Sequence, residues 1–257
     1  MARHVVGSSA GFLAALLVAA AAGAQPHFTL EGRYWDGRLD VSARVSDGAI
    51  GTVFDFKDDL GLADTALPEG RFVWTFGPHT RFELSYLQVG YDGDATVTRT
   101  IVFRGTTYTV GTRVLTTLDE KYLRLGWVWQ FVDVGDGIFR LGTVLEIKRL
   151  SIAATRAAPE LDPPVRQADT IEGVLPAAGL AIDVSPHRGV DIFLEGSGVD
   201  AGTRGSMVDA EAGVRYYPTA AVGVLLSYRI LDLRLRSDPD YAKLRITGPF
   251  AGLSVRW

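Results

Sequence analysis

Histidine is the side chain best placed to act as a general acid or base near neutral pH. This sequence of 257 residues contains four. His4 and His27 lie near the amino terminus, whereas His79 and His187 each lie in a short segment of glycine, proline and polar residues. Such segments form turns at the surface. We therefore expect His79 and His187 to be exposed turn residues and not catalytic bases.

A second group of candidate ligands is acidic and falls within residues 55–69. Its members are Asp55, Asp58, Asp59, Asp64 and Glu69. Carboxylate oxygens bind divalent cations, but these residues lack the regular spacing of a calcium loop. We expect a solvated loop, with no metal and no other cofactor. The sequence contains no cysteine, which excludes disulfides, thiolate metal sites and a lipid-bearing cysteine.

A third group of charges has the spacing of β-strands. From Glu120 to Phe131, one face carries Leu123, Leu125, Trp127, Trp129 and Phe131, and the other carries Glu120, Tyr122, Arg124, Gly126 and Gln130. The pattern recurs in later segments, and its polar face carries charges of both signs. The charges assigned to this face are Glu120, Arg124, Arg140, Glu146, Lys148, Asp209, Glu211, Arg215 and Arg229. A period of two predicts strands with one apolar and one polar face, so we predict an all-β chain.

The elements that would position these charges are about ten strands, with eight as an alternative count. We predict strands at residues 28–45, 70–76, 81–91, 113–132, 138–152, 171–184, 190–197, 207–217, 221–235 and 241–257. Tight turns alternate with longer connections such as 46–69 and 92–112. A soluble β-sandwich also shows alternating apolar and polar residues along its strands, but short turns at one end and long loops at the other are typical of a transmembrane barrel. We therefore predict an antiparallel up-and-down transmembrane β-barrel with 46–69 and 92–112 outside the cell.

The amino terminus indicates export. Arg3 precedes a short apolar run at 11–22, and Ala22-Gly23-Ala24 has the form of a signal-peptidase site. We predict a signal peptide at 1–24 and one barrel domain at 25–257; the alternative, a retained anchor, would need a longer apolar run. No long apolar stretch follows Gln25, which excludes a helical membrane protein. The mild net charge of −4 argues against nucleic-acid binding.

The last predicted strand contains an inconsistency. Leu244 and Ile246 share one parity, whereas Leu253, Val255 and Trp257 share the other. If every apolar side chain faces lipid, the strand must change its facing between these groups. Proline in a ladder is tolerated at a bulge, so we expect a β-bulge at Gly248-Pro249.

Two short motifs resemble those of a known family. The last eight residues, Phe250 to Trp257, resemble the carboxy-terminal assembly signal of outer-membrane barrels, through Gly252, Val255 and Trp257. The segment Phe54 to Leu62 is similar to a first-loop motif of uncharacterised small barrels of Gram-negative bacteria. The resemblance implies a cell outer membrane location, contact with lipid and lipopolysaccharide, and insertion by the barrel assembly machinery. Barrel enzymes of resembling families use histidine near the outer rim, and none of the four is predicted there, so we expect no enzyme.

The predicted lumen leads to the functional hypotheses. A barrel of this strand number is little wider than one filled by side chains, and unpaired charges inside it would be costly. The inward charges should therefore pair across a plugged or very narrow lumen. This favours a structural or surface-exposed role. A narrow passive channel for small solutes is the alternative, and a lipid-modifying or proteolytic enzyme is the third hypothesis.

Overall fold

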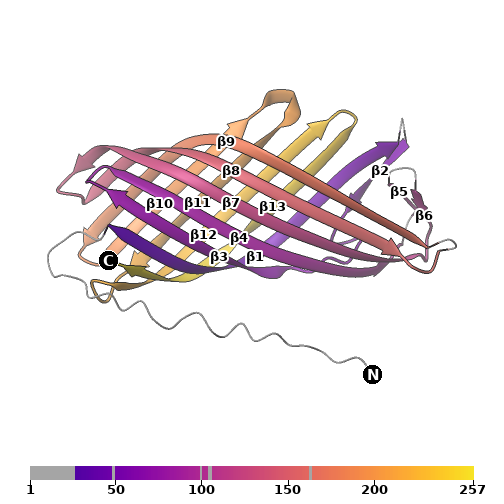
Figure 1. Cartoon of the computed structure of the whole chain (residues 1–257), viewed down its shortest axis with the longest axis horizontal. Coiled ribbons are helices and arrows are strands. Elements are labelled where there is room, and N and C mark those ends of the chain that lie inside the picture. The colour runs from indigo at the N-terminus through magenta and orange to yellow at the C-terminus, as the bar shows by residue number, and fades with distance from the viewer. Residues whose placement is uncertain (1–26, 48–49, 99, 104–105, 162–163) are drawn as a thin grey trace, which may run out of the picture.

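In the part of the chain that the computed structural model describes, namely residues 27–47, 50–98, 100–103, 106–161 and 164–257, ten antiparallel strands close into a barrel (Figure 1). They are β1 (Phe28–Asp47), β3 (Thr65–Phe76), β4 (Thr80–Thr96), β7 (Arg113–Val134), β8 (Phe139–Ala158), β9 (Val165–His187), β10 (Val190–Asp200), β11 (Gly205–Tyr216), β12 (Val222–Ser237) and β13 (Asp240–Arg256). Neighbours in sequence are neighbours in the barrel. The predicted all-β barrel of about ten strands is confirmed, whereas the signal peptide at 1–24 lies outside the described residues.

Pairing between the first and last strands closes the barrel. The register of β1 with β13 runs from Thr29 opposite Arg256 to Arg44 opposite Tyr241. At the very end, the backbone N–H groups of His27 and Phe28 donate to the carbonyl of Trp257 at 2.9 and 3.0 Å. Closure joins the two terminal strands of the sheet to each other, which matters because an unpaired backbone group in hydrocarbon costs several kcal/mol.

The two ends of the barrel differ. The connections β3–β4, β7–β8, β9–β10 and β11–β12, each of two to five residues, lie at the end where both β1 begins and β13 finishes (Figure 1), whereas the two longest connections, β1–β3 and β4–β7, lie at the opposite end. Gly77 and Gly189 have φ values of 67° and 84° in two of these turns, a left-handed conformation that glycine adopts without strain. We call this the turn end and the opposite one the loop end. His79 and His187 lie at the turn end.

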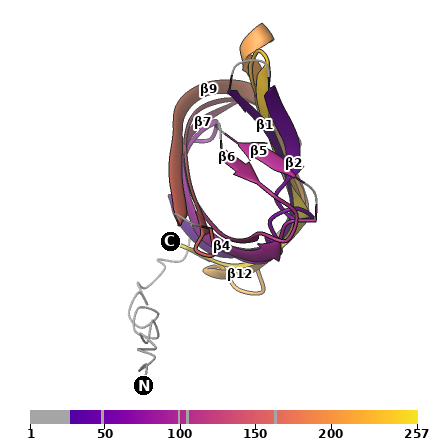
Figure 2. The ribbon, with the colours of Figure 1, turned by 90° about the vertical axis from the view of Figure 1, so that its right-hand side faces the viewer.

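Accessory elements occupy the loop end. Strand β2 (Ile50–Asp55) folds back along β1, and β5 (Ile101–Phe103) pairs with β6 (Thr106–Tyr108). Viewed from the loop end, the β5–β6 hairpin lies across the opening of the ring of strands (Figure 2). A single turn of 3-10 helix (Gly202–Arg204) connects β10 to β11. No helix in the described residues is long and apolar enough to cross a membrane.

The predicted loop at 46–69 needs correction. It contains the end of β1, all of β2 and the first residues of β3. The segment between β2 and β3 packs into the barrel, where Phe56, Leu60 and Leu62 are buried and Leu62 forms a bridge with Gly93 of β4. The prediction of a solvated loop failed because it considered the acidic residues and overlooked the apolar ones between them.

The facing of side chains divides the barrel into two halves. On β7, the outward residues from Leu123 to Phe131 are apolar, whereas those from Arg113 to Lys121 are mostly polar. The same change occurs on β12, where outward Tyr228 and Ile230 give way to Asp232 and Arg234. We call the part of the barrel with the apolar exterior the turn half, its exterior the apolar belt, and the remainder the loop half.

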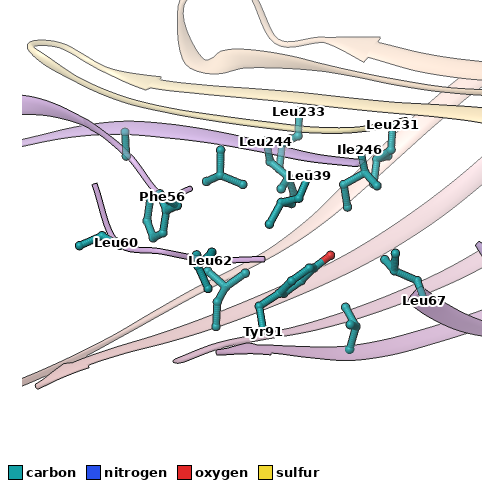
Figure 3. Close-up of a cluster of buried hydrophobic side chains, with 14 of the residues drawn as sticks. Leu39, Phe56, Leu60, Leu62, Leu67, Tyr91, Leu231, Leu233, Leu244 and Ile246 are labelled. Carbon is teal, nitrogen blue, oxygen red and sulfur yellow. The ribbon is translucent and has the colours of Figure 1, made fainter. Parts of the chain in front are cut away.

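The chemical character of the inward side chains also changes between the two halves, in the direction opposite to that of the outward ones. In the turn half the inward side chains are mainly charged, and in the loop half they form one apolar cluster. Figure 3 shows part of this cluster, in which Leu39, Leu231, Leu244 and Ile246 converge with Phe56 and Leu62 from the inward-folded segment. A transmembrane strand needs about 9–11 residues, whereas β7 has 22. The loop half is therefore the part of the barrel beyond the membrane.

The expected bulge at Gly248-Pro249 is absent. Both β12 and β1 pair with β13 in a constant register on either side of these residues. Leu244 and Ile246 point into the lumen with exposures of 5% and 0%, while Leu253 points outward with 60%. The backbone keeps its facing, and it is the apolar side that changes, because the exterior meets lipid in one half and water in the other.

Candidate functional site

The structure brings the predicted inward charges together. Seven of the nine are buried: Glu120, Arg124, Glu146, Lys148, Asp209, Glu211 and Arg229. Six of these lie in the turn half, and Glu120 lies at its border, between outward Asp119 and Lys121 of the loop half. Arg140 and Arg215 also face inward but are partly exposed near the turn end. Together with the charged residues that they contact, these side chains form a continuous group across the lumen, which we call the charge layer.

Arg229 on β12 lies at the centre of the charge layer and is fully buried. Its Nε and Nη2 donate to the two carboxylate oxygens of Asp209 on β11, each at 2.8 Å. Its Nη1 donates to Glu69 of β3 at 2.6 Å. A planar guanidinium suits this two-pronged contact with a carboxylate. One arginine thus joins strands that lie on separate parts of the barrel wall.

The same Asp209 carboxylate receives two further donors. The Nζ of Lys148 and the hydroxyl of Tyr122 donate to its Oδ2 at 3.0 and 2.9 Å. The Nζ of Lys148 also lies 3.1 Å from Oε2 of Glu146, and the same oxygen accepts a short hydrogen bond from the hydroxyl of Ser197. Strands β7, β8, β10, β11 and β12 are therefore linked through the interior by charged hydrogen bonds, which are stronger than neutral ones.

A second part of the charge layer lies closer to the turn end. Arg81 on β4 donates to Glu83 at 2.7 Å, to Asp183 at 2.7 Å and to Glu195 at 2.9 Å. Arg71 on β3 donates to the same Glu83. A polar cavity of about 350 Å³ lies between these residues and the turn end, where it opens to solvent. Its inner wall is formed by members of the charge layer, including Arg71, Arg81 and Glu83.

Several members of the charge layer were outside the predicted set. Arg33 of β1 donates to Glu69 at 2.8 Å and to Glu211. Glu69 was missed because its strand was predicted to begin at Gly70, which left it in the acidic loop. Glu31 and Arg33 could have been found from the alternation in the first strand, where they share a parity opposite to Leu30 and Tyr34.

Aromatic rings separate the charge layer from the apolar cluster. Trp35 and Phe250 stack with ring centroids 5.1 Å apart. The guanidinium carbon of Arg33 lies 4.4 Å from the Phe250 centroid, and that of Arg229 lies 5.2 Å from the Trp35 centroid. Such cation–π contacts are favourable within about 6 Å. The rings thus lie between the charged and apolar parts of the interior and contact the charged part directly.

Exposure at this level determines whether water can pass. Arg229 has 0% of its surface exposed, Lys148 and Trp35 have 1%, and Arg71 and Tyr122 have 2%. These side chains come from five strands around the barrel, β12, β8, β1, β3 and β7. A continuous water path through the charge layer would leave part of their surface accessible. In the described part of the chain, these five side chains leave almost no surface accessible to water at this level.

Glu120 is the exception within the charge layer. It is 1% exposed, yet neither carboxylate oxygen has a hydrogen-bond partner among the residues that the structure describes. Asp209, at 3% exposure, receives several donors in the same layer. A buried polar group without a partner costs free energy. Glu120 should therefore lower the stability of the folded protein, whereas the similarly buried Asp209 should raise it.

The acidic segment has a structural role in the part that can be described. Asp55 Oδ1 accepts hydrogen bonds from the backbone N–H groups of Lys57 at 2.7 Å and Asp58 at 3.0 Å. Asp64 accepts from Lys57 Nζ and from the backbone of Leu39, both at 2.8 Å. Burial opposes ionisation of Asp64, but these two donors lower the pKa of its carboxyl. No group of potential ligands within the described residues is arranged to hold a metal ion.

The three residues of the carboxy-terminal motif lie on β13 and just after it. Val255 pairs with Leu30 and Gly252 pairs with Arg33. A Cβ on Gly252 would lie 2.9 Å from the carbonyl oxygen of Gly32, so the close approach of β1 and β13 favours glycine here. The Trp257 ring lies with its centroid 5.9 Å from that of Phe28. The motif therefore forms the closing seam.

The fold is similar to those of solved outer-membrane proteins. The outer membrane protease OmpT from Escherichia coli aligns with a TM-score of 0.58 at 11% identity, over 90% of this chain and 96% of OmpT. The translocator domain of autotransporter NalP from Neisseria meningitidis gives 0.48 at 10% identity, over 92% and 90%. Ail, the attachment invasion locus protein of Yersinia pestis, gives 0.35 at 8% identity, over 91% and 100%.

No protein-family model matches the sequence, and no curated protein matches it. The likeness to OmpT concerns the fold alone. The closed antiparallel barrel and its apolar belt are the features of an outer-membrane β-barrel. The chain is therefore an outer-membrane protein.

Proposed function

We propose that this outer-membrane barrel is a non-conducting protein with a structural role, whose loop half stands exposed at the cell surface. The observation that carries the proposal is the burial of Arg229 and Lys148, at 0% and 1% exposure, in ion pairs that cross the lumen. The turn end faces the periplasm and the loop end faces the exterior, because both long connections, β1–β3 and β4–β7, lie at the loop end and long loops are usual on the outer side.

Conductance in a planar lipid bilayer tests the proposal. The refolded protein should insert without producing discrete current steps. As a positive control, the triple variant Arg71→Ser, Lys148→Ser and Arg229→Ser removes three large side chains from the charge layer and should conduct, provided that it still shows the heat-dependent gel shift of a folded barrel. Discrete steps from the unmodified protein would favour the narrow channel and overturn the proposal.

We also propose that the protein is not an enzyme. The described histidines, His27, His79 and His187, are at the turn end, away from the exposed surface proposed here. What OmpT does is not carried over, because 11% identity supports a common fold only. Cleavage of peptides or of outer-membrane lipid by the purified protein would contradict this part of the proposal.

The proposed partners are outer-membrane lipid with lipopolysaccharide and, during insertion, the barrel assembly machinery. The closing seam supports the second partner, because Trp257 and Phe28 exchange backbone hydrogen bonds there. Deleting residues 255–257 should lower the yield in the outer membrane and leave misassembled protein in the periplasm. Trimming 237–240 at the loop end serves as the control and should have little effect. Normal yield of a compact, heat-shifted truncated protein would contradict the assembly role.

A further inference from the structure

The wall of the loop half is uneven. Strand β9 has 23 residues, but its neighbour β10 has 11, and their pairing reaches only as far as Ala178 opposite Gly198. Among the described strands, residues 165–177 of β9 pair with β8 alone. Above the β10–β11 hairpin the barrel wall therefore has a gap, bordered on one side by the free edge of β9.

An apolar cavity of about 140 Å³ lies behind this gap. One side is formed by Ile152 and Ala154 of β8 and by Ile171 of β9. Leu118 of β7, opposite Ala154, belongs to the same side. The other side comes from strands across the barrel and from the inward-folded segment, and it includes Val41, Phe56, Leu233 and Leu244. The cavity thus spans the interior from the β8–β9 wall to the β12–β13–β1 wall.

The lining sets the chemistry of what fits. Most of it is aliphatic, and its charged members include Arg156 and Asp169, which pair with each other at 3.0 Å. The third charged residue of the lining is Lys243. An apolar cavity of about 150 Å³ in another protein stays dry and accepts benzene. An uncharged hydrocarbon of that size would gain contacts with the aliphatic majority of the lining, whereas burying an ion there would cost its hydration.

The position of the gap offers a route for such a molecule. The β10–β11 hairpin ends where the outward residues change from apolar, as at Val208, to polar, as at Asp200 and Ser206. This level is the outer edge of the apolar belt. Two apolar side chains on the free edge of β9, Ile171 and Val174, are 48% and 62% exposed. The gap therefore opens where the outer leaflet meets water.

We propose that the loop half binds a small uncharged hydrocarbon group, about the size of a benzene ring or a short acyl segment, which enters through the gap above β10–β11. This binding does not depend on whether the lumen conducts, because the cavity lies on the loop side of Trp35 and Phe250. The hydrocarbon group comes either from a free small molecule or from an acyl chain of the surrounding lipid.

Fluorine NMR of fluorobenzene with the full-length mature protein tests the proposal. In amphipol, which supplies no lipid, the unmodified protein should show saturable binding. Ala154→Phe fills the cavity and should weaken that binding at least tenfold. Ala153→Phe is the matched control, because it adds the same ring one residue away on the outward face of β8, and its affinity should stay within twofold.

A second filling variant, Leu233→Trp, keeps the test decisive if Ala154→Phe does not fold as judged by its heat-dependent gel shift. Repeating the titration in phospholipid nanodiscs distinguishes the two sources. Unchanged affinity supports a free hydrocarbon, and a loss of affinity in nanodiscs supports occupation by a lipid acyl chain. Equal fluorobenzene binding by the unmodified protein and by a folded filling variant in amphipol would overturn the proposal.

Discussion

The turn half and the loop half use the same strands with opposite chemistry. In the turn half Leu125 faces outward and Arg124 faces inward, and the latter is 4% exposed. In the loop half of the same strand Thr117 faces outward and Leu118 faces inward, and the latter is again 4% exposed. The backbone alternates without a break. The solvent outside the wall therefore decides which parity is apolar.

The difference follows from what each half can gain by burial. Outside the membrane, an apolar interior is stabilised because it leaves water. Within the membrane the exterior must be apolar, and the lumen can be filled with charges if they are paired. The loop half is thus built like a water-soluble barrel, and its stability should depend on apolar packing. The turn half should depend on the completeness of its ion pairs.

The largest expected effect comes from breaking the charge layer at its centre. Arg229→Leu removes the two-pronged partner of Asp209, which keeps Lys148 and Tyr122, and one partner of Glu69. Breaking a buried pair typically costs about 3–5 kcal/mol. The free energy of unfolding in urea, measured on protein refolded into lipid vesicles, should fall by this amount. The double variant Arg229→Leu with Asp209→Leu should recover part of the loss, because it leaves one fewer unpaired charge. A double variant that loses the sum of both single effects would show that the pair is not coupled.

The next effect tests the exterior. Leu125→Arg places a charge on the apolar belt and should cost about 2–4 kcal/mol if the residue lies near the bilayer midplane. Thr117→Arg makes the same addition on the same strand and the same face, but in the loop half, and should change the unfolding free energy by less than about 0.5 kcal/mol. Equal costs for the two variants in vesicles would mean that both positions meet the same solvent.

The smallest effect is expected at Glu120, the buried carboxylate that lacks a hydrogen-bond partner among the described residues. Glu120→Gln removes a charge that has no hydrogen-bond partner among the described residues, so the unfolding free energy should stay the same or rise slightly. Asp209→Asn, its matched control, should be clearly destabilising because Arg229 and Lys148 lose their common partner. A large loss from Glu120→Gln would reveal a contribution that the hydrogen bonds do not account for.

The contrast between the halves also explains which features of the fold and of the charge layer could be predicted from the sequence. Strand number and the inward charges could be predicted, because alternation is strong along the apolar belt, as from Leu123 to Phe131. Strand ends at the loop end were underestimated: β4 continues to Thr96 although its outward residues become polar after Tyr86. Leu244 and Ile246 were interpreted as facing lipid because alternation reveals two faces without saying which solvent each one meets. The pairing partners of the charges depend on closure of the barrel, which brings Arg33 to Glu211 across a separation of 178 residues.

Chemical labelling along the outward face of β7 tests the central claim most directly. The chain contains no cysteine, so single variants Thr117→Cys, Asp119→Cys, Leu125→Cys and Trp127→Cys each carry one reactive thiol. In intact cells treated with a membrane-impermeant maleimide, residues 117 and 119 should be labelled, while 125 and 127 should react only after the protein is unfolded in detergent. Labelling of residues 125 and 127 as fast as 117 and 119 in intact cells would contradict the change of solvent along the strand, and with it the division of the barrel into two halves.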